Sequence, residues 1–262
     1  DLVDYYMPEN GVYHNLILAK INTFYPGHAS QMMHAFWGVG QMSFVKHAIF
    51  VNSDAPKLTS HDEIIRYILN RIYVDDILVS RGATDHLDHA SPKFAVGGKL
   101  GLDCTGDEID ELGITILEDS ELLSKMKNIS SDIKGLKQYY KDTKNPICVI
   151  SVEKTRSQKY LFEELKALFS HIKILVIVDE KANDLENPYM LIWRVTNNMD
   201  SSRDLYIEGN TICLDGTNKN SLDGFTRRWP GDVNCTKSVI DSLRERNIID
   251  IDDEFIKKHQ LY

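Results

Sequence analysis

Short apolar runs alternate with amphipathic stretches along the first part of the chain. Residues 14–22, 47–52 and 76–81 are rich in aliphatic and β-branched side chains, which is typical of strands. Between them, 28–42 and 61–72 carry apolar side chains at helical spacing. Under the right-handed crossover rule, this β-α-β-α-β order predicts a mostly parallel sheet.

The same order of elements recurs in the second half of the chain, as expected of a duplicated unit. The counterparts of the three strands lie at 146–153, 174–178 and 204–207, and those of the two helices at 157–169 and 187–197.

A short tag that shares Leu, Asp and Thr follows the third predicted strand of each copy, at 100–106 and 212–218. Between the copies, a charged stretch contains two helical patterns, at 118–127 and 131–141. We therefore expect an α/β protein with two related βαβαβ lobes, mostly parallel sheets and a helical bridge. The predicted units are a first lobe at 1–106, the bridge at 107–144, and a second, shortened lobe with C-terminal helices at 145–262.

Charge and composition narrow the function classes. Thirty basic against thirty-nine acidic side chains leave a net charge of −9, which argues against nucleic acid as a partner. The longest apolar runs are about five residues, so no transmembrane segment is predicted. Four scattered cysteines without a C-x-x-C pair indicate reduced thiols. Because the chain opens on Asp1 without a charged-then-apolar leader, we expect a piece of a longer cytoplasmic protein.

The segment after the third strand of the first copy, 82–99, is sixteen residues longer than its counterpart and concentrates polar chemistry. It follows a strand end, where open α/β sheets place ligands. His86 and His89 could bind a metal, but they point apart in an extended segment and no third ligand is evident, so ordinary loop polar groups are the favoured interpretation. Gly97-Gly98-Lys99 does not complete a phosphate-binding loop. The polar residues of this segment are Asp85, His86, Asp88, His89, Ser91, Lys93 and Lys99.

Two further features point to packing rather than to catalysis. The first helix has almost no charged face, which predicts that it packs against a domain or subunit beyond its own sheet. The cluster Arg227-Arg228-Trp229 is expected in a turn at a packing contact or interface. No nucleophile–base constellation follows from the spacing, so we assign no catalytic residue and no metal ligand to this chain.

Four blocks of this sequence resemble the C-terminal domain of the UbiD family of decarboxylases, the 3-octaprenyl-4-hydroxybenzoate carboxy-lyase and its relatives. The blocks are DYYMPENGVYHNLILAKI (4–21), YPGHASQMMHAFWG (25–38), VKHAIFV (45–51) and LDHASPKFAVGGKLGLDCTGD (87–107). The ending at 214–250 is similar to that family's terminus, where a K-W-P-G-like turn precedes a final helix. The resemblance implies a long-form member that carries the C-terminal subdomain twice.

The resemblance also implies a chemistry. Enzymes of this family use prenylated flavin mononucleotide, with a divalent metal (manganese) and potassium, to decarboxylate aromatic acids, polyprenyl-aryl quinone precursors among them. Their cofactor site and catalytic Glu-Arg-Glu set lie in an upstream domain that this sequence lacks. The chain is then the substrate-covering and assembly region, with no cofactor of its own and inactive alone. A polyprenyl substrate would make the cytoplasmic enzyme peripheral to the membrane.

By position alone, the resemblance places two segments of the first copy as a wall over the substrate side of the flavin. The expected wall residues are Gln41, Met42, Ser43, Phe44 and Lys46 before the second strand, and Thr84, Asp85 and His86 after the third. Met42 and Phe44 have an alternative interpretation as core, and His86 as an ordinary loop residue. The expected partners are the upstream flavin-binding domain and a second copy of the protein, with the second lobe structural or in oligomer contacts. Alternatives are a non-catalytic oligomerisation module and a metal-binding α/β protein that uses His86 and His89.

Overall fold

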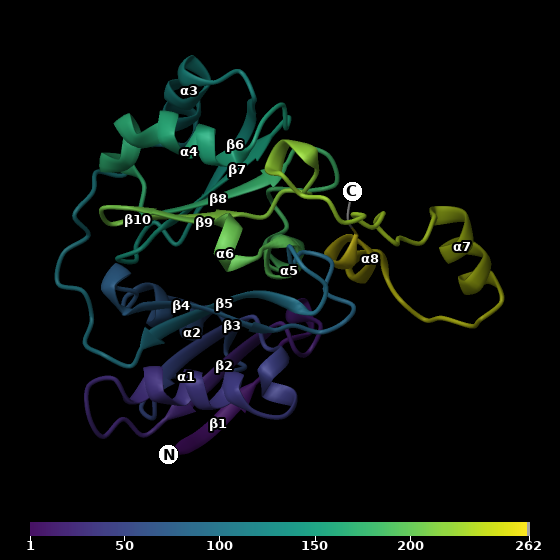
Figure 1. Cartoon of the computed structure of the whole chain (residues 1–262). Coiled ribbons are helices and arrows are strands. Elements are labelled where there is room, and N and C mark those ends of the chain that lie inside the picture. Colours follow the sequence, from purple (N-terminus) through teal and green to yellow (C-terminus); the bar gives the residue numbers. More distant parts are fainter. Residues whose placement is uncertain (261–262) are drawn as a thin grey trace.

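The first lobe is a five-stranded sheet with helices (Figure 1). Its elements are β1 (Leu2–Tyr6), β2 (Leu16–Ile21), α1 (His28–Gly38), β3 (His47–Asn52), α2 (His61–Leu69), β4 (Ile77–Ala83) and β5 (Val96–Cys104). The strand order is β1-β2-β3-β5-β4. The three central strands are parallel, and the two edge strands run antiparallel to their neighbours.

The second lobe repeats this design in the computed structural model, which describes residues 1–260. Its elements are α3 (Asp119–Ile129), β6 (Ile133–Tyr139), β7 (Ile147–Val152), α4 (Gln158–Glu164), β8 (Ile174–Asp179), α5 (Pro188–Asn198), α6 (Ser201–Asp204), β9 (Leu205–Glu208) and β10 (Thr211–Asp215). The order β6-β7-β8-β10-β9 and the strand directions match those of the first lobe. The predicted α/β class with two related lobes is confirmed.

The role of the repeated tag differs from the prediction. The two L-D-x-T segments do not follow a third strand; they form the carboxyl ends of β5 and β10, the third parallel strands, with Thr105 and Thr217 just beyond. The runs predicted as third parallel strands, 76–81 and 204–207, are the antiparallel edges β4 and β9, so the sheets are mixed. A direct strand-to-strand connection forms a hairpin, and only a crossover would keep the strands parallel.

One half of the predicted helical bridge is a strand. The helix at 118–127 is present as α3, but the helix predicted at 131–141 is wrong, because β6 occupies Ile133–Tyr139 and pairs with β7. The prediction failed because Lys134, Lys137 and Lys141 have the spacing of a polar helix face. Lysines also protect the exposed edge strand of a sheet from pairing with other chains, and β6 is such an edge.

Three apolar clusters hold the lobes together. One lies between α1 and the outer face of the first sheet, and a second between α3, α4 and the outer face of the second sheet. The third lies between the sheets, where Leu16 and Leu18 of β2 share one cluster with Val149 and Val176 of the other lobe, and α2 and α5 contribute to it (Figure 1). The two lobes therefore have a common inner core.

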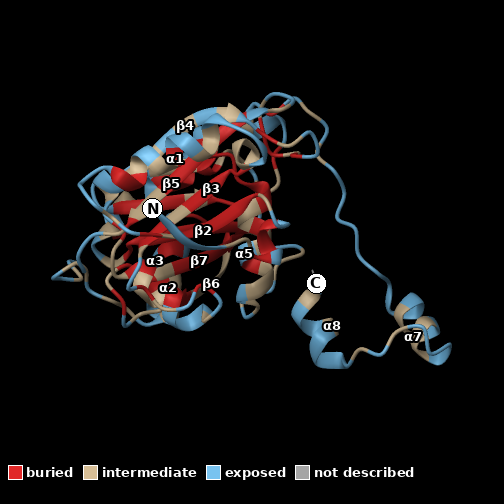
Figure 2. Cartoon of the chain, turned by 90° about the horizontal axis from the view of Figure 1, so that it is seen from below, coloured by how far each residue is buried: buried red, intermediate tan, exposed pale blue. Residues whose placement is uncertain are grey.

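The C-terminal part of the chain leaves this body as an extended arm (Figure 2). It carries α7 (Lys237–Glu245) and α8 (Asp253–His259), neither of which has a buried residue. The tail returns to the body at α8, because the Asn187 side chain at the start of α5 donates to the carbonyls of Lys257 and Lys258 at 3.2 and 3.0 Å. Within residues 1–260, no helix combines the length and the apolar character needed to cross a membrane.

Candidate functional site

The two segments expected to form a substrate wall meet at one edge of the first sheet. The turn Gln41–Phe44 leads into β3, and the loop after β4 leads into β5. Because β4 is antiparallel, its end lies where β3 and β5 begin, at the amino edge of the parallel strands. The loop therefore does not lie at the carboxyl edge, where open α/β sheets bind ligands, and that prediction is wrong.

A buried lysine on β5 joins the two segments. The Lys99 ammonium donates to the carbonyl oxygens of Ser43 and Val45 at 2.7 and 2.8 Å, and also to that of Ala83. Lys99 is fully buried. Burial, together with the nearby Lys46 ammonium, lowers the pKa of Lys99 to about 8. Lys99 thus fixes the turn before β3 against the end of β4.

A buried ion pair supports the loop from inside. Lys46 Nζ lies 2.9 Å from Asp88 Oδ1, and both side chains are excluded from solvent. The Asp88 carboxylate also accepts bonds from the Ser91 amide at 3.1 Å and from the Ser91 hydroxyl, which contacts Thr84 Oγ1 at 3.0 Å. Although burial opposes the charged form, the Lys46 ammonium and these bonds hold the pKa of Asp88 below its usual value.

The expected wall residues divide into interior supports and surface groups. Lys46 and Thr84 are buried in the Asp88 network, whereas Gln41 and His86 are exposed. Asp85 accepts a bond from the Leu87 amide at 2.7 Å. Met42, Ser43 and Phe44 are half-buried.

The rim of this edge is apolar. Met42 packs against the cluster under α1, in keeping with the core interpretation. The His86 ring lies 5.0 Å from that of Phe94, and Phe94, Leu87 and Val39 are large apolar side chains that remain exposed. Exposed apolar side chains such as Phe94, beside His86, are typical of a surface that another part of a protein covers.

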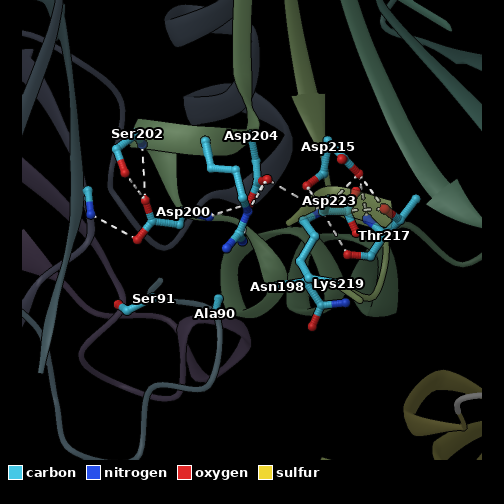
Figure 3. Close-up of polar contacts among 12 residues, drawn as sticks. Ala90, Ser91, Asn198, Asp200, Ser202, Asp204, Asp215, Thr217, Lys219 and Asp223 are labelled. Atoms are coloured by element: carbon cyan, nitrogen blue, oxygen red, sulfur yellow. Dashed lines mark hydrogen bonds and ion pairs between the residues drawn. The ribbon is translucent and has the colours of Figure 1, made fainter. Parts of the chain in front are cut away.

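The glycine pair before Lys99 is a point of contact between the lobes. The Gly98 amide donates to Asp200 Oδ2 of the second lobe at 2.9 Å (Figure 3). A Cβ atom at Gly98 would lie 2.5 Å from the Ser202 nitrogen, and one at Gly97 would lie 2.5 Å from Asp200 Oδ2. The Gly-Gly-Lys segment therefore receives a carboxylate of the same chain, which explains its likeness to an anion-binding loop.

A second buried charge cluster, the Lys219 cluster, lies at the carboxyl edge of the second sheet (Figure 3). Lys219 Nζ lies 2.9 Å from Asp215 Oδ1 at the end of β10, and Lys154 Nζ lies 2.6 Å from Asp223 Oδ2. Asp215 Oδ1 also accepts a hydrogen bond from the Thr217 amide at 2.9 Å. The Asp and Thr of the repeated tag thus form an Asx turn here. The cluster pairs its own charges, and its visible effect is to hold the loops after β7 and β10 together.

Sequence reasoning missed the residues that organise the candidate wall, namely Lys99, Asp88 and Ser91. All three belong to the polar segment singled out from sequence, but nothing local showed which carbonyls or cations they meet. The two histidines weighed as metal ligands have separate surroundings: His86 packs against the ring of Phe94 in a tilted arrangement, whereas His89 Nε2 lies 3.2 Å from Asn198 Oδ1 of α5. In the described part of the chain, no three His, Cys, Asp or Glu residues are grouped to hold a metal ion.

Residues 1–104 and 113–242 match the family model described as 3-octaprenyl-4-hydroxybenzoate carboxy-lyase C-terminal domain. The chain belongs to this family. One matched range covers the first lobe, and the other covers the second lobe with the start of the tail.

Curated relatives are longer than this chain. Two Helicobacter pylori proteins, from strains J99 and 26695, are 50% identical to it over 250 residues, which is 95% of this chain and 40% of each relative. A protein of Archaeoglobus fulgidus is 34% identical over 115 residues, covering 42% of this chain and 23% of its own. The chain thus spans about two fifths of the length of its H. pylori relatives.

Solved structures with partial likeness are UbiD-class enzymes and aromatic acid decarboxylases. HmfF from Pelotomaculum thermopropionicum, in complex with FMN, aligns with a TM-score of 0.37 and 19% identity over 42% of this chain and 24% of its own. An evolved dimeric form of HmfF in complex with prFMN aligns with a TM-score of 0.39 and 15% identity, over 66% of this chain and 44% of its own. A 3,4-dihydroxybenzoic acid decarboxylase from Enterobacter cloacae aligns with a TM-score of 0.35 and 19% identity, over 48% of this chain and 29% of its own. The family assignment rests on the sequence match.

Proposed function

We propose that this chain is the C-terminal, substrate-covering and assembly region of a prenylated-flavin-dependent carboxy-lyase that acts on an aromatic acid. The observation that carries the proposal is the meeting of residues 41–46 and 84–86 at one edge of the first sheet, where Lys99 bonds to both sides. Membership of the carboxy-lyase C-terminal family supplies the reaction class. A quinone precursor is one candidate substrate, and a polyprenyl-aryl acid would bring this cytoplasmic enzyme to the membrane surface.

In this proposal the buried cations shape the wall and the exposed groups face the substrate. Lys46 and Lys99 hold the two segments rigidly through Asp88 and through main-chain carbonyls. Gln41 and His86 then contact the acid, while the apolar rim keeps water from the reacting face. The chain's own contribution is to orient the acid and exclude solvent.

The proposal assigns the flavin, its manganese and its potassium to the upstream part of the longer protein. The donor set here does not fit a metal, because residues 1–260 contain no suitable group of His, Cys, Asp and Glu side chains. The prenylated flavin, when bound there, supplies the electron sink for decarboxylation.

The surface of α1 fits a contact with that upstream part. The helix carries no Asp, Glu, Lys or Arg, and Phe36 and Trp37 on it stay half-exposed. Val39, directly after it, is 74% exposed. A helix of this composition is stable in water only when most of its sides are covered.

The test uses a protein of the relatives' full length, loaded with prenylated flavin, manganese and potassium. We expect carbon dioxide release from at least one aryl or polyprenyl-aryl acid, and none from the 262-residue chain alone. Gln41→Ala and His86→Ala should raise KM, whereas the exposed control Lys159→Ala on α4 should not. A fully loaded enzyme that decarboxylates no such acid refutes the proposed activity.

A second candidate, an assembly module without catalysis, is favoured by α7. The helix stands on the arm away from the body, and Val239 and Leu243 lie four residues apart on one face of it (Figure 2). We propose that this face packs on a second copy of the protein. Light scattering should show a dimer that Leu243→Asp or deletion of 237–262 converts to monomer, with Ser242→Asp as the matched control. A monomer at all concentrations leaves substrate covering as the role.

A further inference from the structure

The segment that follows the second lobe, residues 225–232, has no helix or strand, bends at Arg227 and lies against the first lobe; we name it the strap. Its side chains alternate, with Phe225, Arg227 and Trp229 buried or half-buried and the residues between them exposed. Every second side chain of the strap is therefore turned toward the protein, and the others face solvent. The surface beneath the strap includes the loop 84–91 of the candidate wall.

Arg227 makes the closest contact with that loop. Its Nη1 donates to the carbonyl oxygen of Ser91 at 2.7 Å and to that of Asp88 at 3.2 Å. The Asp88 side chain is held from the other side by Lys46. The same two loop residues are therefore fixed from inside by their own lobe and from outside by the strap.

Trp229 extends this contact to α5. Its ring meets that of His89 edge-on, with centroids 4.6 Å apart and planes at 90°. His89 Nε2 in turn lies 3.2 Å from Asn198 Oδ1. Asp88 and His89, two of the loop residues that the strap touches, are thus also bonded to groups outside the loop.

Both ends of the strap are fixed to the body. At its start, Phe225 is buried, and the Arg203 guanidinium of α6 lies 5.1 Å from its ring centroid. At its end, Asp232 accepts two bonds from the buried Arg194 guanidinium of α5, at 2.9 and 3.1 Å. A segment fixed at both ends can restrain a loop packed beneath its middle.

We infer that the strap positions loop 84–91, and that Arg227 is the positioning residue through which the second lobe supports the candidate wall of the first. Beyond Thr84, whose amide donates to the Ala95 carbonyl at 3.1 Å, residues 85–91 lie outside the strands, and such segments open locally at low cost unless other groups hold them. Hydrogen bonds from a charged donor to main-chain carbonyls are among the stronger restraints available. The second lobe then acts on the wall and is more than a structural copy.

Hydrogen exchange on the 262-residue chain tests the restraint without any assay of activity. In Arg227→Met, amides of 84–91 should exchange about tenfold faster, while those of β2, β3 and β5 keep their wild-type rates. Arg227→Lys, which can still donate to both carbonyls, should recover most of the protection. The exposed neighbour gives the matched control, Arg228→Met, which should change nothing. An unchanged loop, or equal acceleration throughout both sheets, overturns the inference.

The effect on the substrate rests on the proposed function and is measured separately in the loaded, full-length protein. Arg227→Met should raise KM about tenfold with kcat within about twofold, and Arg227→Lys should restore KM. A wild-type enzyme without turnover would refute the proposed function and leave the exchange result to decide the restraint. Turnover with an unchanged KM in Arg227→Met, despite faster loop exchange, would refute the link between strap and wall.

Discussion

The imidazole of His47, at the start of β3, lies with its Nε2 3.1 Å from the carbonyl oxygen of Thr196 in α5 of the other lobe. His47 is buried, and burial together with the adjacent Lys46 ammonium lowers its pKa to about 3. A neutral imidazole at the contact between the lobes makes their association sensitive to acid.

The pH dependence of unfolding should therefore carry a His47 contribution. An unfolded histidine titrates near 6.5, so between pH 6.5 and about 3 the unfolded chain binds the extra proton and stability falls as the pH falls. Urea unfolding at pH 7.5 and 5.0 should show a loss of about 2 kcal/mol from this group. His47→Gln keeps a donor and should remove most of that loss, while exposed His61→Gln should behave as wild type. The same slope in His47→Gln would contradict the assignment.

Breaking the buried pair beneath the wall should be costly. Lys46→Met leaves the Asp88 carboxylate buried without its cation, and the free energy of unfolding should fall by about 3–5 kcal/mol. Adding Asp88→Asn removes the stranded charge and should recover a large part of the loss. Urea denaturation of both single variants and the double variant gives the coupling energy. A double variant as unstable as the sum of the singles would mean that the two residues are not coupled.

The close approach of the lobes at β5 should tolerate no side chain. Gly98→Ala places a methyl group 2.5 Å from both the Ser202 nitrogen and Ser201 Oγ, and should reduce the free energy of unfolding by about 1–3 kcal/mol. Gly106→Ala has open space around its Cβ and should stay within about 0.5 kcal/mol of wild type. Chemical denaturation of the two variants side by side provides the measurement. Equal stability would show that α6 can move away from β5 without cost.

The four thiols should separate by reactivity. Cys104, Cys148 and Cys213 are buried, and burial raises the pKa of each, whereas Cys235 on the arm is exposed. A native chain titrated with a thiol reagent should show one fast-reacting group, and Cys235→Ser should abolish it. Unfolding in urea should reveal the remaining three. A second fast thiol in the native chain would contradict the burial of one of the strands.

The repeat was predictable because its signal is local. Apolar runs such as 47–52 and 174–178 mark buried strands by composition alone, and their common order indicated two lobes. The direction of a strand, in contrast, has no local signal. The side chains of β4 do not show that it pairs with β5 as an antiparallel hairpin. The strand at Ile133–Tyr139 carries lysines at helical spacing, and only pairing with β7 decides its state.

The candidate site shows the same limit. The resemblance predicted two segments of the candidate wall, and their side chains could be named, but the groups that position them are distant in sequence. Lys99 acts on Ser43, Arg227 acts on Ser91, and Gly98 receives Asp200, each across more than fifty residues. Such pairings depend on which strands are neighbours and on how the lobes pack, and no one segment of the sequence encodes either.

The common inner core determines how the association of the two lobes responds to dilution of the protein. Each lobe covers the inner face of the other, as two subunits do in a symmetric dimer, with α2 and α5 in equivalent places. Here one covalent chain joins the halves, so their association is intramolecular and its equilibrium does not depend on protein concentration. Two identical subunits would have to change together, whereas each half of this chain can acquire substitutions independently. One half can therefore keep a long polar loop while the other supplies the segment that holds it.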